Sequence, residues 1–361
     1  MDKNKEIKQN NDKSKEKPSL RLNPFSMHVN PSLFEKATDD EKQELVIMRK
    51  STSLWKDAMR RFRKNTFAMV ALVLIIVLFL FAFVGPLLSP YDYDQFNDGE
   101  EDQGPVIVND AGQEVFNQAH PFGTDKFGRD LLVRNMYGAR ISLSIGLIAA
   151  LLTFIIGSLY GSISGFIGGR TDNIMMRIID IIYSIPDLLI VILLSVSLKE
   201  PLENVLKASP IFSVISDLGP AFFSMLIVFA MLYWGTMARI VRGEVLRIKE
   251  QEYVLAARAM GAKSSRIIRK HVLPNCMGPI IVTTTLQIPS AIFTESFLSF
   301  IGLGINAPLA SLGSMVTDAL QGVYSYPTRV LFPALIIALI ILAFNTVGDA
   351  LRDVLDPRMK K

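Results

Sequence analysis

The feature that most constrains this chain is a set of six long apolar stretches. An α-helix needs about 20 apolar residues to cross the hydrocarbon core of a membrane. Half of the 361 residues are hydrophobic and the mean hydropathy is +0.33, too apolar for an ordinary soluble domain. We therefore predict an all-α polytopic membrane protein with six transmembrane helices, near residues 66–88, 141–167, 178–198, 221–241, 279–300 and 330–350.

The charges beside these stretches predict the orientation in the membrane. Residues 1–65 form a basic tail, which we expect to be partly disordered, with an amphipathic helix near residues 53–64. Residues 89–139 form an acidic insertion after the first helix. Since Lys and Arg are enriched on the cytoplasmic side, we expect the insertion outside and both termini, including residues 354–361, inside.

Several kinds of chemistry find no support in the sequence. The single cysteine, Cys276, excludes an internal disulfide, and the three histidines fall in separate segments, so we expect no metal site. His120 has Asp125 and Asp130 nearby but no serine or cysteine nucleophile, which favours a structured turn over a catalytic site. No Gly-Lys pair of a phosphate-binding loop occurs, so another polypeptide must bind ATP if ATP drives transport. The basic residues flank apolar stretches, which argues against a nucleic-acid partner.

Small residues recur at every fourth position in the second apolar stretch. They are Gly157, Gly161 and Gly165. This spacing lets two helices pack backbone to backbone in lipid. It predicts a helix–helix contact, either within the subunit or with a second membrane subunit.

Polar side chains at membrane depth indicate a candidate pathway. They are Asp187, Gln287 and Glu295. Ionisable groups are costly in lipid and tend to face a cavity. For Asp187, an interhelical hydrogen bond is an equally open interpretation.

The polar, basic stretch 250–278 separates two apolar stretches. It reads as two short helices joined at Gly261, a natural residue for a left-handed helix cap, with Pro274 ending the second. Ala256 and Ala257 give the first helix a small-residue face. We predict that this loop inserts into a groove of a partner protein, and an ordinary basic cytoplasmic loop is the alternative.

The loop resembles a known motif. Its pattern is A-A-x-x-x-G followed nine residues later by x-x-L-P, formed here by Ala256, Ala257, Gly261, Leu273 and Pro274. This pattern is similar to the EAA motif in the coupling loop of ABC-importer permeases. The chain departs from it at Leu255, where the motif has glutamate, and at His271, where it has isoleucine. The stretch 120–130 and the ending 348–358 resemble the C-type subunit of the oligopeptide/dipeptide/nickel branch.

The resemblance implies a type I ABC-importer permease fold, with residues 140–353 as its transmembrane domain. The chain would be a permease subunit for oligopeptides or dipeptides, neither an enzyme nor a cofactor-binding protein. Its partners would be a homologous B-type permease, two ATPase subunits that bind ATP and Mg, and an extracytoplasmic substrate-binding protein. The tail 1–65 and the insertion 89–119 fall outside the resemblance.

Two alternatives stay open beside this interpretation. The first is a secondary transporter or channel that ATP does not drive, since six membrane helices suit several classes of protein. A secondary transporter would be expected to show internal repeats, and none is clear in the sequence. The second is an ABC permease for nickel, glutathione or another small solute.

Overall fold

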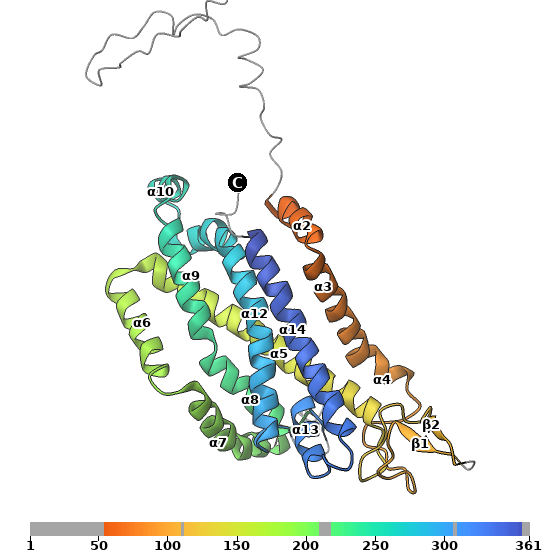
Figure 1. Ribbon diagram of the computed structural model, residues 1–361. Coiled ribbons are helices and arrows are strands. Elements are labelled where there is room, and N and C mark those ends of the chain that lie inside the picture. Colours follow the sequence, from red (N-terminus) through yellow and green to blue (C-terminus); the bar gives the residue numbers. More distant parts are fainter. Residues whose placement is uncertain (1–53, 110–111, 209–217, 306–308, 356–361) are drawn as a thin grey trace, which may run out of the picture. The chain divides into compact units, whose positions relative to one another are not determined.

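The computed structural model describes residues 54–109, 112–208, 218–305 and 309–355. Most of the predicted basic tail and the predicted C-terminal segment lie outside these ranges. Helices make up most of the described chain (Figure 1). The N-terminal ones are α2 (Leu54–Lys64), α3 (Thr66–Phe79), the π-helix η2 (Leu80–Val84), α4 (Gly85–Leu88), α5 (Leu131–Ile167), α6 (Gly169–Ile182) and α7 (Asp187–Ala208). The others are α8 (Gly219–Leu232), α9 (Trp234–Ile248), α10 (Glu252–Ala259), α11 (Ser264–Ile267), the π-helix η5 (Ile268–Val272), α12 (Leu273–Phe300), α13 (Leu312–Leu320) and α14 (Thr328–Leu355).

Five helical stretches of the described chain are long and apolar enough to cross a membrane. They are Thr66–Leu88, Leu131–Ile167, Gly219–Ile248, Ser264–Phe300 and Thr328–Leu355. The pair α6 and α7 makes a sixth crossing if it is counted as one span, although its two helices are bent by 78°. The all-α polytopic fold predicted from the sequence is therefore confirmed.

Several elements differ from the predicted positions, among them the fifth span, which begins at Ser264 and not near residue 279. The second span begins at Leu131, before residue 141, because the Asp130 side chain caps α5 by accepting the Val133 N–H at 2.7 Å. The predicted third span, 178–198, is two helices that break before Asp187, because Pro186 disfavours helical geometry in the residue before it. The short helix α13 was not predicted from the sequence.

The small insertion after the first span contains a β-hairpin. Strands β1 (Val106–Val108) and β2 (Glu114–Phe116) pair antiparallel, with Val106 opposite Phe116. The hairpin and α13 lie at one end of the helical assembly, and α10, the start of α2 and the end of α14 lie at the other (Figure 1). The spanning helices connect these two ends.

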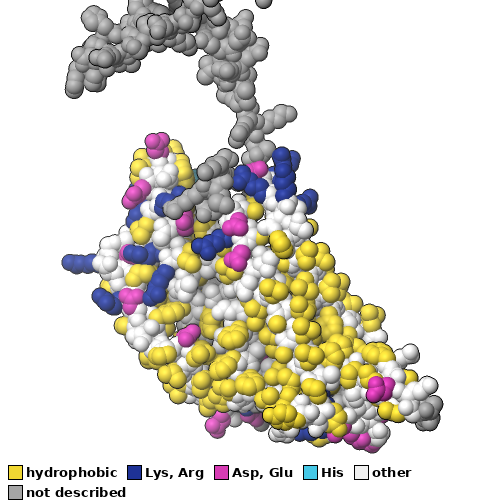
Figure 2. Space-filling model, viewed as in Figure 1, with side chains coloured by type: hydrophobic (Ala, Val, Ile, Leu, Met, Phe, Trp, Pro, Cys, Tyr) yellow, Lys and Arg dark blue, Asp and Glu magenta, His cyan; other side chains and the backbone are white. Residues whose placement is uncertain are grey.

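The middle of the assembly is apolar on its outside. Large exposed side chains on α3 and α4 include Phe67, Val73 and Leu87. In the space-filling view, hydrophobic side chains cover the flank, and most charged side chains gather towards the two ends (Figure 2). This distribution fits a band of lipid around the spanning helices.

The three glycines at four-residue spacing let α5 approach α9 of the same chain. A Cβ atom at Gly157 would come within 2.6 Å of Met237 Cβ, and one at Gly165 within 2.9 Å of the Arg242 carbonyl oxygen. At Gly161 it would collide with the Ala238 carbonyl oxygen. Of the two interpretations left open by the sequence, the contact within the subunit is the one the structure contains.

Candidate pathway and coupling loop

A cavity of about 1190 Å³ lies beside α12. Its wall is formed by α2, the bend between α6 and α7, the junction of α8 and α9, α12 and the end of α14. The cavity is thus enclosed by segments that are far apart in the sequence. Its position along several spanning helices makes it the candidate pathway.

One face of α12 supplies the polar part of the wall. Thr283, Gln287 and Ser290 recur at helical spacing and all line the cavity. Thr284 points elsewhere, and its hydroxyl donates to the Ile280 carbonyl of its own helix at 2.8 Å. Asp187, the first residue of α7, lines the same cavity, so the structure brings the predicted pathway residues Asp187 and Gln287 together.

Glu295, the third predicted pathway residue, is not among the residues that line this cavity. Its side chain is completely buried, and hydroxyls of Ser142 on α5 and Ser299 on α12 donate to it at 2.7 and 2.8 Å. These bonds replace water around the carboxylate, which explains how it is accommodated inside the protein. The prediction is corrected accordingly: Glu295 belongs to a buried network that joins α5 to α12.

The coupling loop, residues 250–278, begins with α10, which ends at Ala259, and Gly261 just beyond it has a φ of +78°. This left-handed conformation is the one predicted for a glycine cap. Ala256 is exposed as expected, but Ala257 is only 5% exposed. It packs in a cluster with Val254 and other apolar residues of the same chain, because these two positions lie on one face of α10.

The burial of Ala257 corrects its predicted role as a direct partner contact. The exposed apolar surface on α10 and directly after it is formed instead by larger side chains. Tyr253, Leu255 and Met260 are 44%, 49% and 82% exposed. Together with Ala256 and Gly261 they form the accessible tip of the coupling loop.

The second half of the loop is also different from the prediction. Pro274 does not end a helix, since the helical stretch Ser264–Phe300 runs through it. The π-helix η5 precedes Leu273 and Pro274 at the start of α12. Pro274 lacks an N–H group, and the π-helical turn directly before it is where the regular i→i−4 hydrogen bonding of the stretch is interrupted. Pro274 also lines the cavity, so this residue joins the coupling loop to the candidate pathway.

A charge cluster fastens α6 to α9 near the coupling loop. Asp172 is buried and accepts two bonds from Arg242, at 2.5 and 2.6 Å, and one from the Ser164 hydroxyl at 2.5 Å. The Lys249 ammonium donates to the Gly165 carbonyl at 3.0 Å. Sequence reasoning missed this cluster, because its bonded pairs are 70 and 84 residues apart for Arg242 and Lys249, and sequence spacing gives no signal for such pairs.

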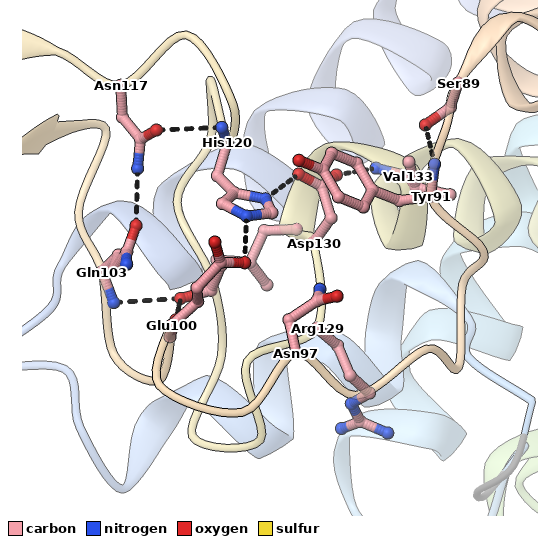
Figure 3. Close-up of polar contacts among 12 residues, drawn as sticks. Ser89, Tyr91, Asn97, Glu100, Gln103, Asn117, His120, Arg129, Asp130 and Val133 are labelled. Atoms are coloured by element: carbon pink, nitrogen blue, oxygen red, sulfur yellow. Dashed lines mark hydrogen bonds and ion pairs between the residues drawn. The ribbon is translucent and has the colours of Figure 1, made fainter.

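His120 lies in a polar cluster at the other end of the molecule (Figure 3). Its ring is completely buried, with Nδ1 at 2.7 Å from Asp130 and Nε2 at 2.9 Å from Glu100. Asp125 pairs with Arg129 instead, at 2.7 Å. Both ring nitrogens are engaged, which fits the predicted structured turn: the cluster holds the insertion against the start of α5.

These features define a class of protein: a multi-pass membrane protein with a polar-lined cavity among its helices and an exposed helical loop at one end. Residues 157–361 match the family described as binding-protein-dependent transport system inner membrane component. Residues 53–105 match the N-terminal TM domain of oligopeptide transport permease C. The chain belongs to the family of binding-protein-dependent transport permeases, and it has the type I ABC-importer permease fold.

Relatives resemble the chain over almost its whole length. The oligopeptide transport system permease protein OppC of Bacillus subtilis (strain 168) is 47% identical over 334 residues, covering 92% of this chain and 99% of the relative. The dipeptide transport system permease protein DppC of the same organism is 45% identical, covering 87% and 89%. OppC of Escherichia coli (strain K12) is 38% identical, covering 85% and 92%.

A solved structure, an inward-facing conformation of the MetNI methionine ABC transporter, matches with a TM-score of 0.47 and 19% identity, covering 63% of this chain and 96% of that chain.

The family match to residues 53–105 corrects one expectation from the sequence. The end of the tail 1–65, from residue 53, and the beginning of the insertion 89–119, up to residue 105, belong to the family similarity, although the short motifs that carried the resemblance begin only at residue 120.

Proposed function

We propose that this chain is a permease subunit of an ATP-driven importer of oligopeptides or dipeptides. The observation that carries the proposal is the near full-length similarity to OppC, with 47% identity over 92% of the chain. The cavity on the polar face of α12 supports it, because a peptide needs hydrogen-bonding groups along its path.

In this proposal two partner ATPase subunits bind ATP and Mg and hydrolyse ATP, and the chain itself needs no cofactor. A homologous B-type permease completes the pathway, and an extracytoplasmic binding protein delivers the peptide. The coupling loop faces the cytoplasm, as do both termini, and its tip enters a groove of an ATPase subunit.

The contacts of α9 provide a physical connection between the coupling loop and the cavity. Helix α9 ends at Ile248, just before α10, and residues of α9 such as Glu244 line the cavity. Ion pairs hold α6 on α9: Asp172 to Arg242, and Asp180 to Arg239 at 2.9 Å. A displacement of α10 by an ATPase subunit would therefore move α6 and α9 together and change the shape of the cavity.

The test is uptake in cells that lack this chain but retain its partners. Cells supplied with the wild-type chain should accumulate a radiolabelled pentapeptide. A Met260→Asp variant should not, because a charge at the exposed tip opposes an apolar contact while leaving the protein folded. Leu342→Ala, an apolar change at an exposed position of α14 outside the cavity wall, controls for membrane abundance.

The same cells distinguish the alternative cargoes and mechanisms. Nickel and glutathione are supplied in parallel, and uptake of either in place of peptide would overturn the peptide assignment. Peptide uptake that persists after the ATPase subunits are deleted would indicate a secondary transporter or channel. Normal uptake by the Met260→Asp variant would contradict the coupling role of the tip.

A further inference from the structure

Six charged side chains line the cavity. Four of them neutralise each other within single helices: Asp57 with Arg61 at 2.9 Å on α2, and Glu244 with Arg247 at 2.8 Å on α9. Intrahelical pairs at these spacings are common on exposed helix faces. They leave little net charge for a molecule inside the cavity.

The other two charges, Asp187 and Arg352, are not neutralised in this way. The Asp187 carboxylate accepts the N–H of the adjacent Leu188 at 2.9 Å, and within the described residues it forms no ion pair. Arg352 is exposed near the end of α14 and forms no ion pair with any residue of the described ranges. The cavity thus offers one anionic and one cationic group to a bound molecule.

Asp187 lies far from the coupling loop. The Tyr183 hydroxyl donates to the Leu232 carbonyl at 2.6 Å, and the neighbouring Tyr233 hydroxyl lies 2.8 Å from Thr294 Oγ1. These contacts place the bend between α6 and α7 near the level of Thr294 on α12. Asp187 begins α7 directly after this bend.

Arg352 lies nearer the coupling loop. On α14, Gly348 packs against Leu286, and Leu355 lies 3.7 Å from the position of a Cβ atom at Gly278. Arg352 stands between them in sequence, so it lies near residue 282 of α12. The two charges are then about 12 residues apart along α12, or about 18 Å at 1.5 Å per residue. An extended peptide spans about 3.3–3.6 Å per residue, so about five residues bridge that distance.

We propose that Asp187 and Arg352 bind the two charged ends of a zwitterionic peptide, which lies extended along α12. Asp187 binds the terminal ammonium group, and Arg352 binds the terminal carboxylate nearer the coupling loop. The guanidinium group suits this task because it donates two parallel hydrogen bonds to a carboxylate. Gln287 and Ser290 line the wall between the two charges and can bond to the peptide backbone. The proposal rests on the proposed function, since it assigns the recognition of the cargo within that pathway.

The test uses the complete transporter in proteoliposomes, with its own binding protein saturated by a radiolabelled pentapeptide that has free termini. Asp187→Asn and Arg352→Gln should each slow the initial uptake rate two- to fivefold, the effect of a charge pair in a hydrated cavity. ATP hydrolysis measured without peptide should stay unchanged. Asp353→Asn, an exposed carboxylate next to Arg352 but outside the cavity wall, should transport like the wild type.

Exchanging the two charges gives a second, independent measurement. Asp187→Lys or Arg352→Glu alone should slow uptake more than the neutral variants, because each repels one end of the peptide. The double exchange should recover at least half of the wild-type rate, since a peptide can then enter in the opposite orientation. A structural role for either residue predicts no such recovery.

Three results would overturn the inference. The first is uptake by both neutral variants at the rate of Asp353→Asn. The second is a parallel loss of peptide-independent ATP hydrolysis, which would indicate that these charges pair with the second permease subunit. The third is failure of the double exchange to recover. A wild-type transporter that takes up no peptide at all would instead refute the proposed function.

Discussion

Replacing Gly161 by alanine tests the packing of α5 on α9 quantitatively. A Cβ atom at Gly161 would collide with the Ala238 carbonyl oxygen and would lie 2.9 Å from Val241 Cβ. Carbon atoms pack favourably at about 3.5–4.0 Å, and neither neighbour can rotate away, because one is backbone and the other is a Cβ atom. Overpacking of this kind costs about 1–3 kcal/mol.

Gly243 provides a matched control on the partner helix. A Cβ atom there would meet nothing within 4 Å, and its φ is not in the left-handed region. Alanine is favoured over glycine inside a helix by about 1 kcal/mol, and this gain applies to both variants. The difference in stability between Gly161→Ala and Gly243→Ala therefore reports the clash alone, about 1–3 kcal/mol.

Thermal unfolding of the purified transporter in detergent measures this difference. We expect Gly243→Ala to match or slightly exceed the wild-type Tm. Gly161→Ala should unfold roughly 2–12 °C below Gly243→Ala, at about 2–4 °C per kcal/mol. If the two variants unfold at the same temperature, α5 and α9 are not in backbone contact and the packing account is wrong.

Three further predictions concern the Asp172–Arg242 ion pair, the topology and the coupling loop. Asp172→Asn should destabilise the transporter by about 1–3 kcal/mol, less than the loss of a fully buried pair, because the Arg242 side chain is 32% exposed. The exchanged pair Asp172→Arg with Arg242→Asp should recover part of the Tm, and an unchanged Tm in Asp172→Asn would contradict the fastening of α6 to α9 by this charge cluster. A membrane-impermeant thiol reagent should label Met260→Cys only in inside-out vesicles and should label Tyr324→Cys in intact cells. The two side chains are 82% and 101% exposed, and they follow α10 and α13, which lie at opposite ends of the helical assembly. The reverse labelling pattern would mean that the predicted orientation in the membrane is inverted. Gly261→Val should reduce peptide uptake at unchanged membrane abundance, because the φ of +78° at this position strains a β-branched residue by about 1–3 kcal/mol. Full uptake by this variant would mean that the left-handed turn after α10 is not needed for coupling.

The sequence was sufficient for those features that depend on local chemistry. Apolar length located the spanning helices, and the left-handed turn at Gly261 follows from its position after a short helix. The spacing of Gly157, Gly161 and Gly165 predicted a close helix–helix contact. The helix that packs against these glycines could not be predicted, because a sequence pattern describes only one surface of a contact. That helix, α9, begins almost 70 residues after Gly165.

Tertiary contacts account for two of the errors, and a local π-helical turn accounts for the third. Ala257 reads as a small exposed residue, but the amphipathic face of α10 turns it towards the chain's own core. Glu295 reads as a pathway residue because carboxylates are costly in membranes, and only the fold shows that Ser142, 153 residues earlier, supplies a hydrogen bond. Pro274 reads as a helix end, whereas the π-helix η5 lets the chain continue into α12.

The burial of the native cysteine, Cys276, affects how the membrane orientation can be tested by thiol labelling. Its position near the start of the fifth span suggests direct thiol labelling as a test of orientation. Cys276 is completely buried, so it will react poorly from either side. The same burial makes the wild-type chain a suitable background for single cysteines introduced at exposed positions.

The central claim is that this chain forms a peptide pathway driven by ATP hydrolysis in other subunits. The most direct measurement compares proteoliposomes that contain the purified chain alone with proteoliposomes that contain the chain, its second permease and its ATPase subunits. The account predicts neither ATP hydrolysis nor peptide accumulation with the chain alone, and both with the complete set when binding protein and peptide are outside and ATP is inside. Hydrolysis of ATP by the chain alone, or peptide accumulation without the ATPase subunits, would contradict it.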